Sequence, residues 1–163
     1  LKVCEISEKK GYRNYFYGST DSVLEKLTQN LKQKFPDLII SGVFSPPFEG
    51  GLGQEEERNI KMINEGKSDI LWVGLGSPKQ DIWMHKYRDK IDTPVMVGVG
   101  AAFDFISGAK RQAPKFIQRM GCEWLFRLIL EPKRLWKRYI IGNVLFLYLL
   151  IKDSIIEKVK KGV

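Results

Sequence analysis

Short β-rich runs alternate with helix-like segments over residues 1–108, and this alternation restricts the possible folds more than any other feature. A strand, a helix and a further strand in succession predict a parallel sheet with helices on its faces. The expected strands are residues 15–17, 38–44, 70–74 and 95–99. The pattern therefore predicts an α/β fold with a Rossmann-like parallel sheet and flanking helices.

The expected helices lie between these strands. Residues 21–35 repeat apolar side chains at helical spacing, and Pro36 ends the segment. Their common face consists of Val23, Leu24, Leu27, Leu31 and Phe35. The other expected helices are residues 55–64, with Ile60 and Ile63 inward, 80–90 and 101–106.

The strand pattern stops after about Gly108, and only helices are expected beyond it. Pro114 would start one helix, residues 123–130 the next, and Pro132 would restart a third. We therefore divide the chain into an α/β body, residues 1–108, and a helical appendage, residues 109–163.

Positive charge is concentrated in the appendage. Residues 110–163 contain 13 Lys and Arg against 4 Asp and Glu, whereas residues 1–109 contain 14 against 15. Aromatic side chains such as Trp124 and Trp136 lie between these cations. An anionic lipid headgroup surface fits this combination best. Nucleic acid would match the positive charge but would gain nothing from the neighbouring apolar run, so it is not expected as a partner.

The longest apolar run, residues 139–151, follows these cations directly. It contains 13 residues, whereas a helix that spans a bilayer needs about 20. A short apolar run between cations is typical of a helix lying in the membrane interface. The alternative is a helix packed in a core or a dimer interface, and exposed apolar surface here would also favour a homo-oligomer.

Several classes of site have no sequence support. Cys4 and Cys122 lie far apart, and His85 is the one histidine, so neither a disulfide framework nor a zinc site is expected. No Asp-x-Asp, G-x-G-x-x-G or Walker A motif is present. We therefore expect no metal, no cofactor and no ordinary dinucleotide or ATP site.

The segment after the third expected strand has the composition of a phosphate-binding turn. Gly74 and Gly76 would let the backbone approach a ligand, and Pro78 suits the first helical turn. Polar side chains then begin a helix at its positive end. They are Ser77, Lys79, Gln80 and Asp81. The alternative is a tight turn with an ordinary helix start.

A second strand-to-helix turn follows the fourth expected strand. Gly98 and Gly100 would clear a space for a ligand. Asp104 could bond a ribose or sugar hydroxyl, or it could brace its own helix, and we favour the structural role because an aspartate in a first helical turn is stabilised by the helix dipole.

Two further segments should lie on the same rim. Gly18 and Ser19 are candidate substrate contacts, and Ser19 or Thr20 would cap the following helix. Residues 44–51 form a loop that either contacts substrate as a lid or simply connects two elements.

Cations of the appendage could bind phosphate. Arg127 and Arg134 are seven residues apart and Lys137 follows three later, so a helical path would place all three on one face. Guanidinium groups pair with phosphate oxygens through two hydrogen bonds. The alternative is a solvated face of scattered charges.

These motifs, in this order, resemble the WecG/TagA/CpsF family of bacterial glycosyltransferases, which includes the N-acetylmannosaminyltransferases of wall teichoic acid assembly. The matching stretches are residues 46–48, 69–81, 97–108 and 111–139. The likeness extends from about Val3 to Tyr148.

The resemblance implies transfer of a sugar from a UDP-sugar to a polyprenyl-diphosphate-linked saccharide, with inversion, by a peripheral protein at the cytoplasmic face of the inner membrane. It implies that Gln80 contacts the donor or the reacting sugar beside Gly76, Ser77 and Pro78. Arg127, Arg134 and Lys137 match family cations that close over the active site and meet the diphosphate. Family members commonly have arginine at 137 and glutamate at 81. Lysine at 137 lacks the bidentate fork.

The resemblance also implies a missing part. Family members have a further segment before the point that matches Leu1, including the aspartate thought to act as general base. We therefore expect this chain, which starts without Met or a recognisable signal peptide, to be a fragment or a remnant that is poorly active alone. The alternative function is a non-catalytic, membrane-associated scaffold of envelope biosynthesis.

Overall fold

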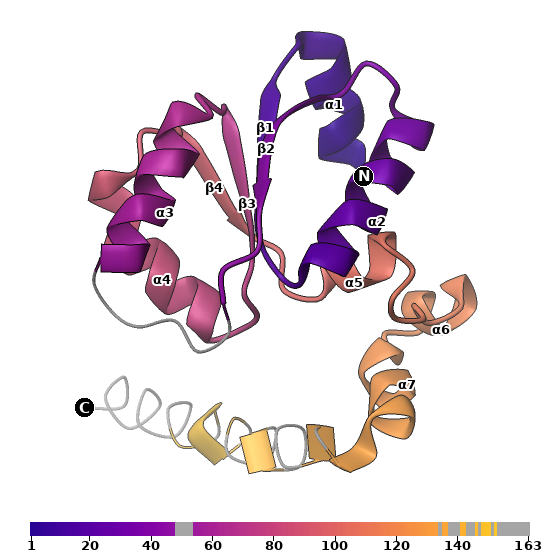
Figure 1. Ribbon diagram of the computed structural model, residues 1–163. Coiled ribbons are helices and arrows are strands. Elements are labelled where there is room, and N and C mark those ends of the chain that lie inside the picture. The colour runs from indigo at the N-terminus through magenta and orange to yellow at the C-terminus, as the bar shows by residue number, and fades with distance from the viewer. Residues whose placement is uncertain are drawn as a thin grey trace, which may run out of the picture. The chain divides into compact units, whose positions relative to one another are not determined.

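The computed structural model describes residues 1–47, 54–133, 135–136, 141–142, 146, 148–150 and 152. The chain forms two compact units, Leu1–Arg111 and Gln112–Val163. The first unit is an α/β layer structure (Figure 1).

A four-stranded sheet forms the centre of the first unit, with strand order β2-β1-β3-β4 and every neighbouring pair parallel. Its strands are β1 (Arg13–Gly18), β2 (Ile39–Phe44), β3 (Ile70–Gly74) and β4 (Val95–Gly98). The predicted parallel sheet is thus confirmed, and all four strands lie where the sequence places them. Because the strands are parallel, their carboxyl ends lie at one edge of the sheet. The last residues of the strands are Gly18, Phe44, Gly74 and Gly98.

Helices cover both faces of this sheet (Figure 1). On one side lie α1 (Lys2–Lys10), α2 (Asp21–Lys34) and α5 (Ala102–Ile106); on the other lie α3 (Gln54–Glu65) and α4 (Lys79–Tyr87), which the 3₁₀ turn Arg88–Lys90 extends. The sequence predicted all of these except α1. Its inner face buries the small side chains Cys4 and Ser7 in place of an apolar stripe, so no helical periodicity marks it.

The α2 face of the sheet holds the first core. Leu24, Leu27 and Leu31 of α2 are buried against the sheet side chains Phe16 and Trp72. The Phe16 and Trp72 rings stack with their centroids 6.3 Å apart. The periodic face predicted for this helix is therefore the face that packs.

The second core lies on the α3 and α4 face of the sheet. It contains Tyr15 and Tyr17 of β1, which point to the opposite face from Phe16. Tyr17 stacks on Trp83 of α4 with ring centroids 4.5 Å apart. Ile60 and Ile63 of α3 are buried beside them, as predicted. The Trp83 indole Nε1 donates to Glu56 Oε2 at 2.9 Å, which ties α3 to α4.

Buried Asn14 joins four elements at the start of β1. Its Oδ1 accepts from Trp72 Nε1 at 2.9 Å and from Ser7 Oγ at 3.4 Å. Its Nδ2 donates to the carbonyl oxygens of Tyr12 and Ile39 at 2.9 and 3.3 Å. A fully buried amide is stable here because both of its ends have partners.

The second unit contains α6 (Lys115–Arg119) and α7 (Glu123–Leu130). Both follow the predicted starts, and the bounds of α7 match the prediction. Large apolar side chains of these helices are exposed, among them Phe116, Trp124, Ile129 and Leu130. Within the described part of the chain, no helix is both long and apolar enough to cross a membrane.

Candidate functional site

The turn between β3 and α4 contains the first group of predicted site residues. Gly76 has a φ of +79°, and a side chain there would meet nothing within 4 Å, so its backbone lies open to a ligand. The Gln80 N–H donates to the Gly76 carbonyl at 2.8 Å and closes the turn. Pro78 was predicted in the first helical turn, and it occupies the N-cap position directly before that turn. The turn therefore presents an accessible backbone at the start of a nine-residue helix.

Two predicted polar residues of this turn bond each other. Ser77 Oγ donates to Asp81 Oδ2 at 3.0 Å across the first turn of α4. Asp81 thus receives a local partner in the position that favours a carboxylate near a helix N-terminus. This bond braces the turn, and a contact of Asp81 with substrate stays a prediction.

A small hollow of about 60 Å³ opens beside Lys79. Its walls come from the ends of three strands and from the start of α4. The lining residues are Ser19, Pro46, Pro47, Gly74, Leu75 and Lys79. Because Lys79 has no ion pair among the described residues, its cation is available to an anionic ligand.

Gln80 joins this turn to the turn after β4. Its Oε1 accepts from the Gly100 N–H at 2.9 Å, and its side chain is 8% exposed. A Cβ built on Gly98 would lie 2.9 Å from Gln80 Nε2. Gly98 was expected to clear space for a ligand, but the Gln80 carboxamide occupies that space. A Cβ on Gly100 would lie 3.9 Å from Gln80 Oε1, which is an ordinary contact, so a ligand contact at Gly100 stays a prediction.

Gly74 and Gly18 make close internal contacts at the rim, and their contacts with substrate stay predictions. A side chain on Gly74 would fall on the buried Phe103 ring, and one on Gly18 would lie 2.6 Å from the Gly74 carbonyl carbon. Both glycines therefore permit close internal packing at the rim. Of the two glycines in the β3 to α4 turn, Gly76 alone leaves open space.

Asp104 is held by its own loop. Its Oδ2 pairs with Lys110 Nζ at 3.0 Å, and its carbonyl accepts from the Lys110 N–H at 3.0 Å. The pair is partly exposed, with the Asp104 side chain 22% accessible. This geometry supports the structural role that the sequence analysis favoured.

The turn before α2 differs in one respect from its prediction. Thr20 occupies the N-cap position, but its side chain makes no capping bond and its Oγ1 lies 3.2 Å from Ser22 Oγ. Ser19 adopts a φ of +64° and its carbonyl accepts from Ser45 Oγ at 2.8 Å. Ser19 is thus fixed against the β2 loop, where it lines the small hollow.

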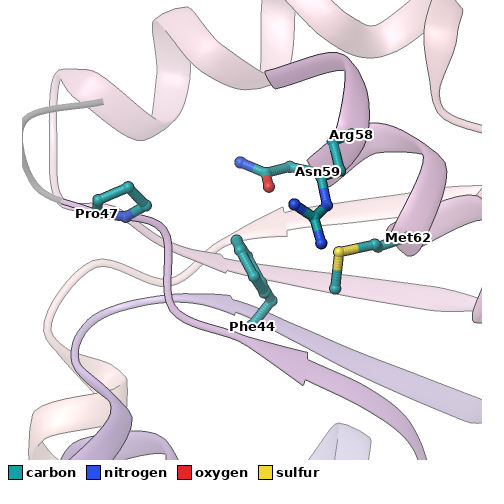
Figure 2. Close-up of a pocket in the computed structure, with 5 residues that line it drawn as sticks. All are labelled: Phe44, Pro47, Arg58, Asn59 and Met62. Carbon is teal, nitrogen blue, oxygen red and sulfur yellow. The ribbon is translucent and has the colours of Figure 1, made fainter. Parts of the chain in front are cut away.

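A second, larger hollow of about 280 Å³ lies between the end of β2 and α3 (Figure 2). Its lining consists of Phe44, Pro47, Arg58, Asn59 and Met62. Arg58 and Asn59 were not among the predicted site residues. A signal was present, because Asn59 precedes Ile60 and lies four residues before Ile63, which places a polar side chain beside the buried face of α3.

Tyr17 stacks on Phe44 of this lining, with ring centroids 6.1 Å apart. Burial raises the pKa of its hydroxyl, and the nearby charge of Glu56 raises it further, whereas a hydrogen bond with Asn59 lowers it. The hydroxyl therefore stays protonated and neutral near pH 7.

The chain matches the family model described as "Glycosyl transferase WecG/TagA/CpsF family" over residues 1–160. The chain belongs to this family. The resemblance found in the motifs is thereby confirmed.

WecG/TagA/CpsF relatives with curated names are longer than this chain. One from Staphylococcus aureus (strain NCTC 8325 / PS 47) is 29% identical over 162 residues, which cover 99% of this chain and 59% of the relative. One from Bacillus spizizenii (strain ATCC 23059 / NRRL B-14472 / W23) is 32% identical over 136 residues, 83% of this chain and 51% of the relative. Both are named N-acetylglucosaminyldiphosphoundecaprenol N-acetyl-beta-D-mannosaminyltransferase.

The predicted cations of this WecG/TagA/CpsF chain belong to its second unit. Arg127 lies in α7, where its Nη2 is 3.5 Å from Glu123 Oε1 one turn earlier. Arg134 and Lys137 lie outside the described residues, as do residues 48–51 of the predicted rim loop. Among the described residues, no cluster of three or more His, Cys, Asp or Glu side chains could hold a metal ion.

Proposed function

We propose that this chain forms the donor-binding part of an inverting glycosyltransferase. The reaction would move N-acetylmannosamine, or a similar sugar, from a UDP-sugar to a polyprenyl-diphosphate-linked saccharide in teichoic acid or related envelope synthesis. The names of the relatives suggest this reaction class. The observation that supports it most is the Gln80 bond to Gly100, which joins two rim turns beside Lys79 and the small hollow.

The donor diphosphate would bind at the start of α4. The helix dipole favours an anion there, and Lys79 lines the adjoining hollow. The bond from Gly100 fixes Gln80 before any ligand arrives. Fixed donors stabilise the charge that develops on UDP as the sugar leaves, because they need no reorganisation during the reaction.

Neither rim aspartate is assigned as the general base. An inverting transfer needs a base within hydrogen-bond reach of the acceptor hydroxyl. Asp81 accepts from Ser77, and Asp104 pairs with Lys110. We therefore assign these carboxylates to positioning the turns.

The second unit would face the membrane that holds the lipid acceptor. Exposed Trp124, Ile129 and Leu130 on α7 supply apolar area, and Arg127 on the same helix supplies a cation. This combination is typical of helices that lie at a lipid interface. We propose that Arg127, Arg134 and Lys137 meet the acceptor or donor phosphates at the cytoplasmic face of the inner membrane.

Direct titration of the chain with UDP tests the donor site. Lys79→Met is expected to weaken UDP binding about tenfold, as loss of one charged contact would. Gln80→Glu keeps an oxygen for the Gly100 N–H but brings a negative charge to the site, so it should also weaken UDP. Lys86→Met, which removes an exposed cation from the last turn of α4, is the matched control and should bind as wild type.

A wild-type chain with no affinity for UDP would contradict the proposal. If that chain still floated with anionic vesicles, the result would favour the non-catalytic scaffold instead.

A further inference from the structure

The hollow between β2 and α3 combines flat apolar walls with two polar side chains. Phe44, Pro47 and Met62 form the walls, and Arg58 and Asn59 supply the polar groups (Figure 2). Its volume of about 280 Å³ is close to the lower limit for sites that enclose a whole small ligand, roughly 300–1,000 Å³. The hollow therefore suits one planar part of a larger ligand.

Asn59 is the more buried of the two polar residues. It is 7% exposed, and its carboxamide extends across the hollow on the side that faces Pro47 (Figure 2). A carboxamide has an oxygen with two lone pairs and two N–H donors, so the interaction of Asn59 with the Tyr17 hydroxyl leaves capacity for a ligand.

Arg58 enters the hollow from the same helix. Its guanidinium points into the hollow beside the Asn59 carboxamide and the Met62 thioether (Figure 2). Within the described part of the chain, Arg58 has neither an ion pair nor a hydrogen bond with another side chain. A guanidinium only donates, so it selects carbonyl or phosphate oxygens.

Pro47 connects this hollow with the small one beside Lys79, because it lines both. One extended ligand can therefore place an anionic group at the start of α4 and a planar group against Phe44. A nucleoside diphosphate has these two parts in succession.

We propose that the larger hollow binds the uracil ring of the donor, an inference that rests on the proposed function. The ring would lie against Phe44 and Met62, since an aromatic face and a thioether both pack well on a base. Asn59 would accept from the uracil N3–H and donate to a neighbouring carbonyl. Arg58 would donate to the O4 carbonyl, which cytosine replaces with an amino group that a guanidinium does not pair with.

Calorimetric titration of the full chain with UDP, CDP and inorganic diphosphate tests this assignment. Wild type should bind UDP more tightly than CDP. Arg58→Gln should weaken UDP about five- to tenfold, as expected for loss of a charged hydrogen bond, and leave diphosphate affinity within about twofold of wild type. Lys61→Gln, which changes another exposed cation of α3, should leave all affinities unchanged.

A second readout does not depend on substitutions. Nuclear Overhauser contacts are expected between uracil H5 and the Met62 methyl or the Phe44 ring of the wild-type chain. Phe44→Leu should weaken UDP and leave diphosphate binding intact.

The outcomes separate the two proposals. If wild type binds UDP, Lys79→Met weakens it, and Arg58→Gln and Phe44→Leu bind it as wild type does, the base lies elsewhere and the present inference is wrong. If wild type binds neither UDP nor diphosphate, the proposed function itself fails.

Discussion

The two units of this chain differ in how far they bury their large apolar side chains. In the first unit Leu27, Leu38 and Leu71 are 0% exposed. In the second, Ile129 is 71% exposed, Met120 69% and Phe116 64%. Charge follows the same division, because the excess of Lys and Arg lies after residue 110.

This difference shows when an apolar segment of sequence predicts buried side chains. In the first unit the period of the apolar residues matches a helix or strand with a partner layer, so the side chains pack. In α7 the sequence is apolar on nearly every side, with Arg127 and Glu123 as its charged residues, and its large side chains stay accessible. Exposed apolar residues grouped in this way mark a surface for a partner.

The sharpest test compares one buried and one exposed aliphatic residue. Leu27→Ala should lower the free energy of unfolding by about 2–5 kcal/mol, because it leaves a cavity in the core. Ile129→Ala should change it by less than about 0.5 kcal/mol. Urea denaturation followed by circular dichroism measures both. Equal losses of unfolding free energy would show that the two units do not differ in this respect.

The polar centre of the first unit offers the next test. Asn14→Leu should cost about 1–3 kcal/mol, because the Trp72 indole N–H loses its buried acceptor. Asn30→Leu is the control, since Asn30 is exposed and donates one bond to the Ile106 carbonyl at 2.8 Å. The same denaturation assay applies, and a neutral Asn14→Leu would show that the first unit does not depend on this amide.

Vesicle binding sharpens the description of the second unit. Ile129→Asp should weaken binding to phosphatidylglycerol vesicles about tenfold, because it removes apolar area and adds a negative charge at an anionic surface. Ile82→Asp is closely matched, since Ile82 is 64% exposed on α4 of the first unit. Equal effects in a flotation assay would mean that the exposed apolar residues of the two units are equivalent.

The smallest expected effect concerns a surface charge of the first unit. Hydrogen bonds from Lys2 and Lys9 lower the pKa of Glu5 to about 2. The stabilisation is therefore complete above the ordinary pKa of 4.5 and is lost as the pH falls toward 2. Glu5→Gln should lower the Tm slightly at pH 6, and the difference should disappear below pH 2 and in high salt, because the pair is exposed.

The layers of the first unit were predictable because they depend on local periodicity. The spacing of Leu24, Leu27 and Leu31 is visible in the sequence, and so is the start of α4 behind Pro78. Helix α1 was not predictable in this way, because its buried residues, Cys4 and Ser7, are small.

The location of the candidate site was predictable from the sequence, but the contacts within it were less so. Parallel strands bring their carboxyl ends to one edge, so the turns at Gly76 and Gly100 were expected on the same rim. The hydrogen bond between Gln80 and Gly100 forms because β3 and β4 are neighbours in the sheet. The spacing of residues along the chain does not predict which strands are neighbours. Asn59 was missed because a single polar residue next to the apolar face of a helix is normally assigned to the solvent-exposed face.

The close approach of Gln80 Nε2 to the Gly98 backbone links two positions that are eighteen residues apart in the sequence. A methyl group at position 98 would require the glutamine to withdraw, and withdrawal would release the Gly100 N–H. Substitutions at these positions should therefore occur together in evolution, so that relatives with a side chain at 98 have also replaced the glutamine at 80.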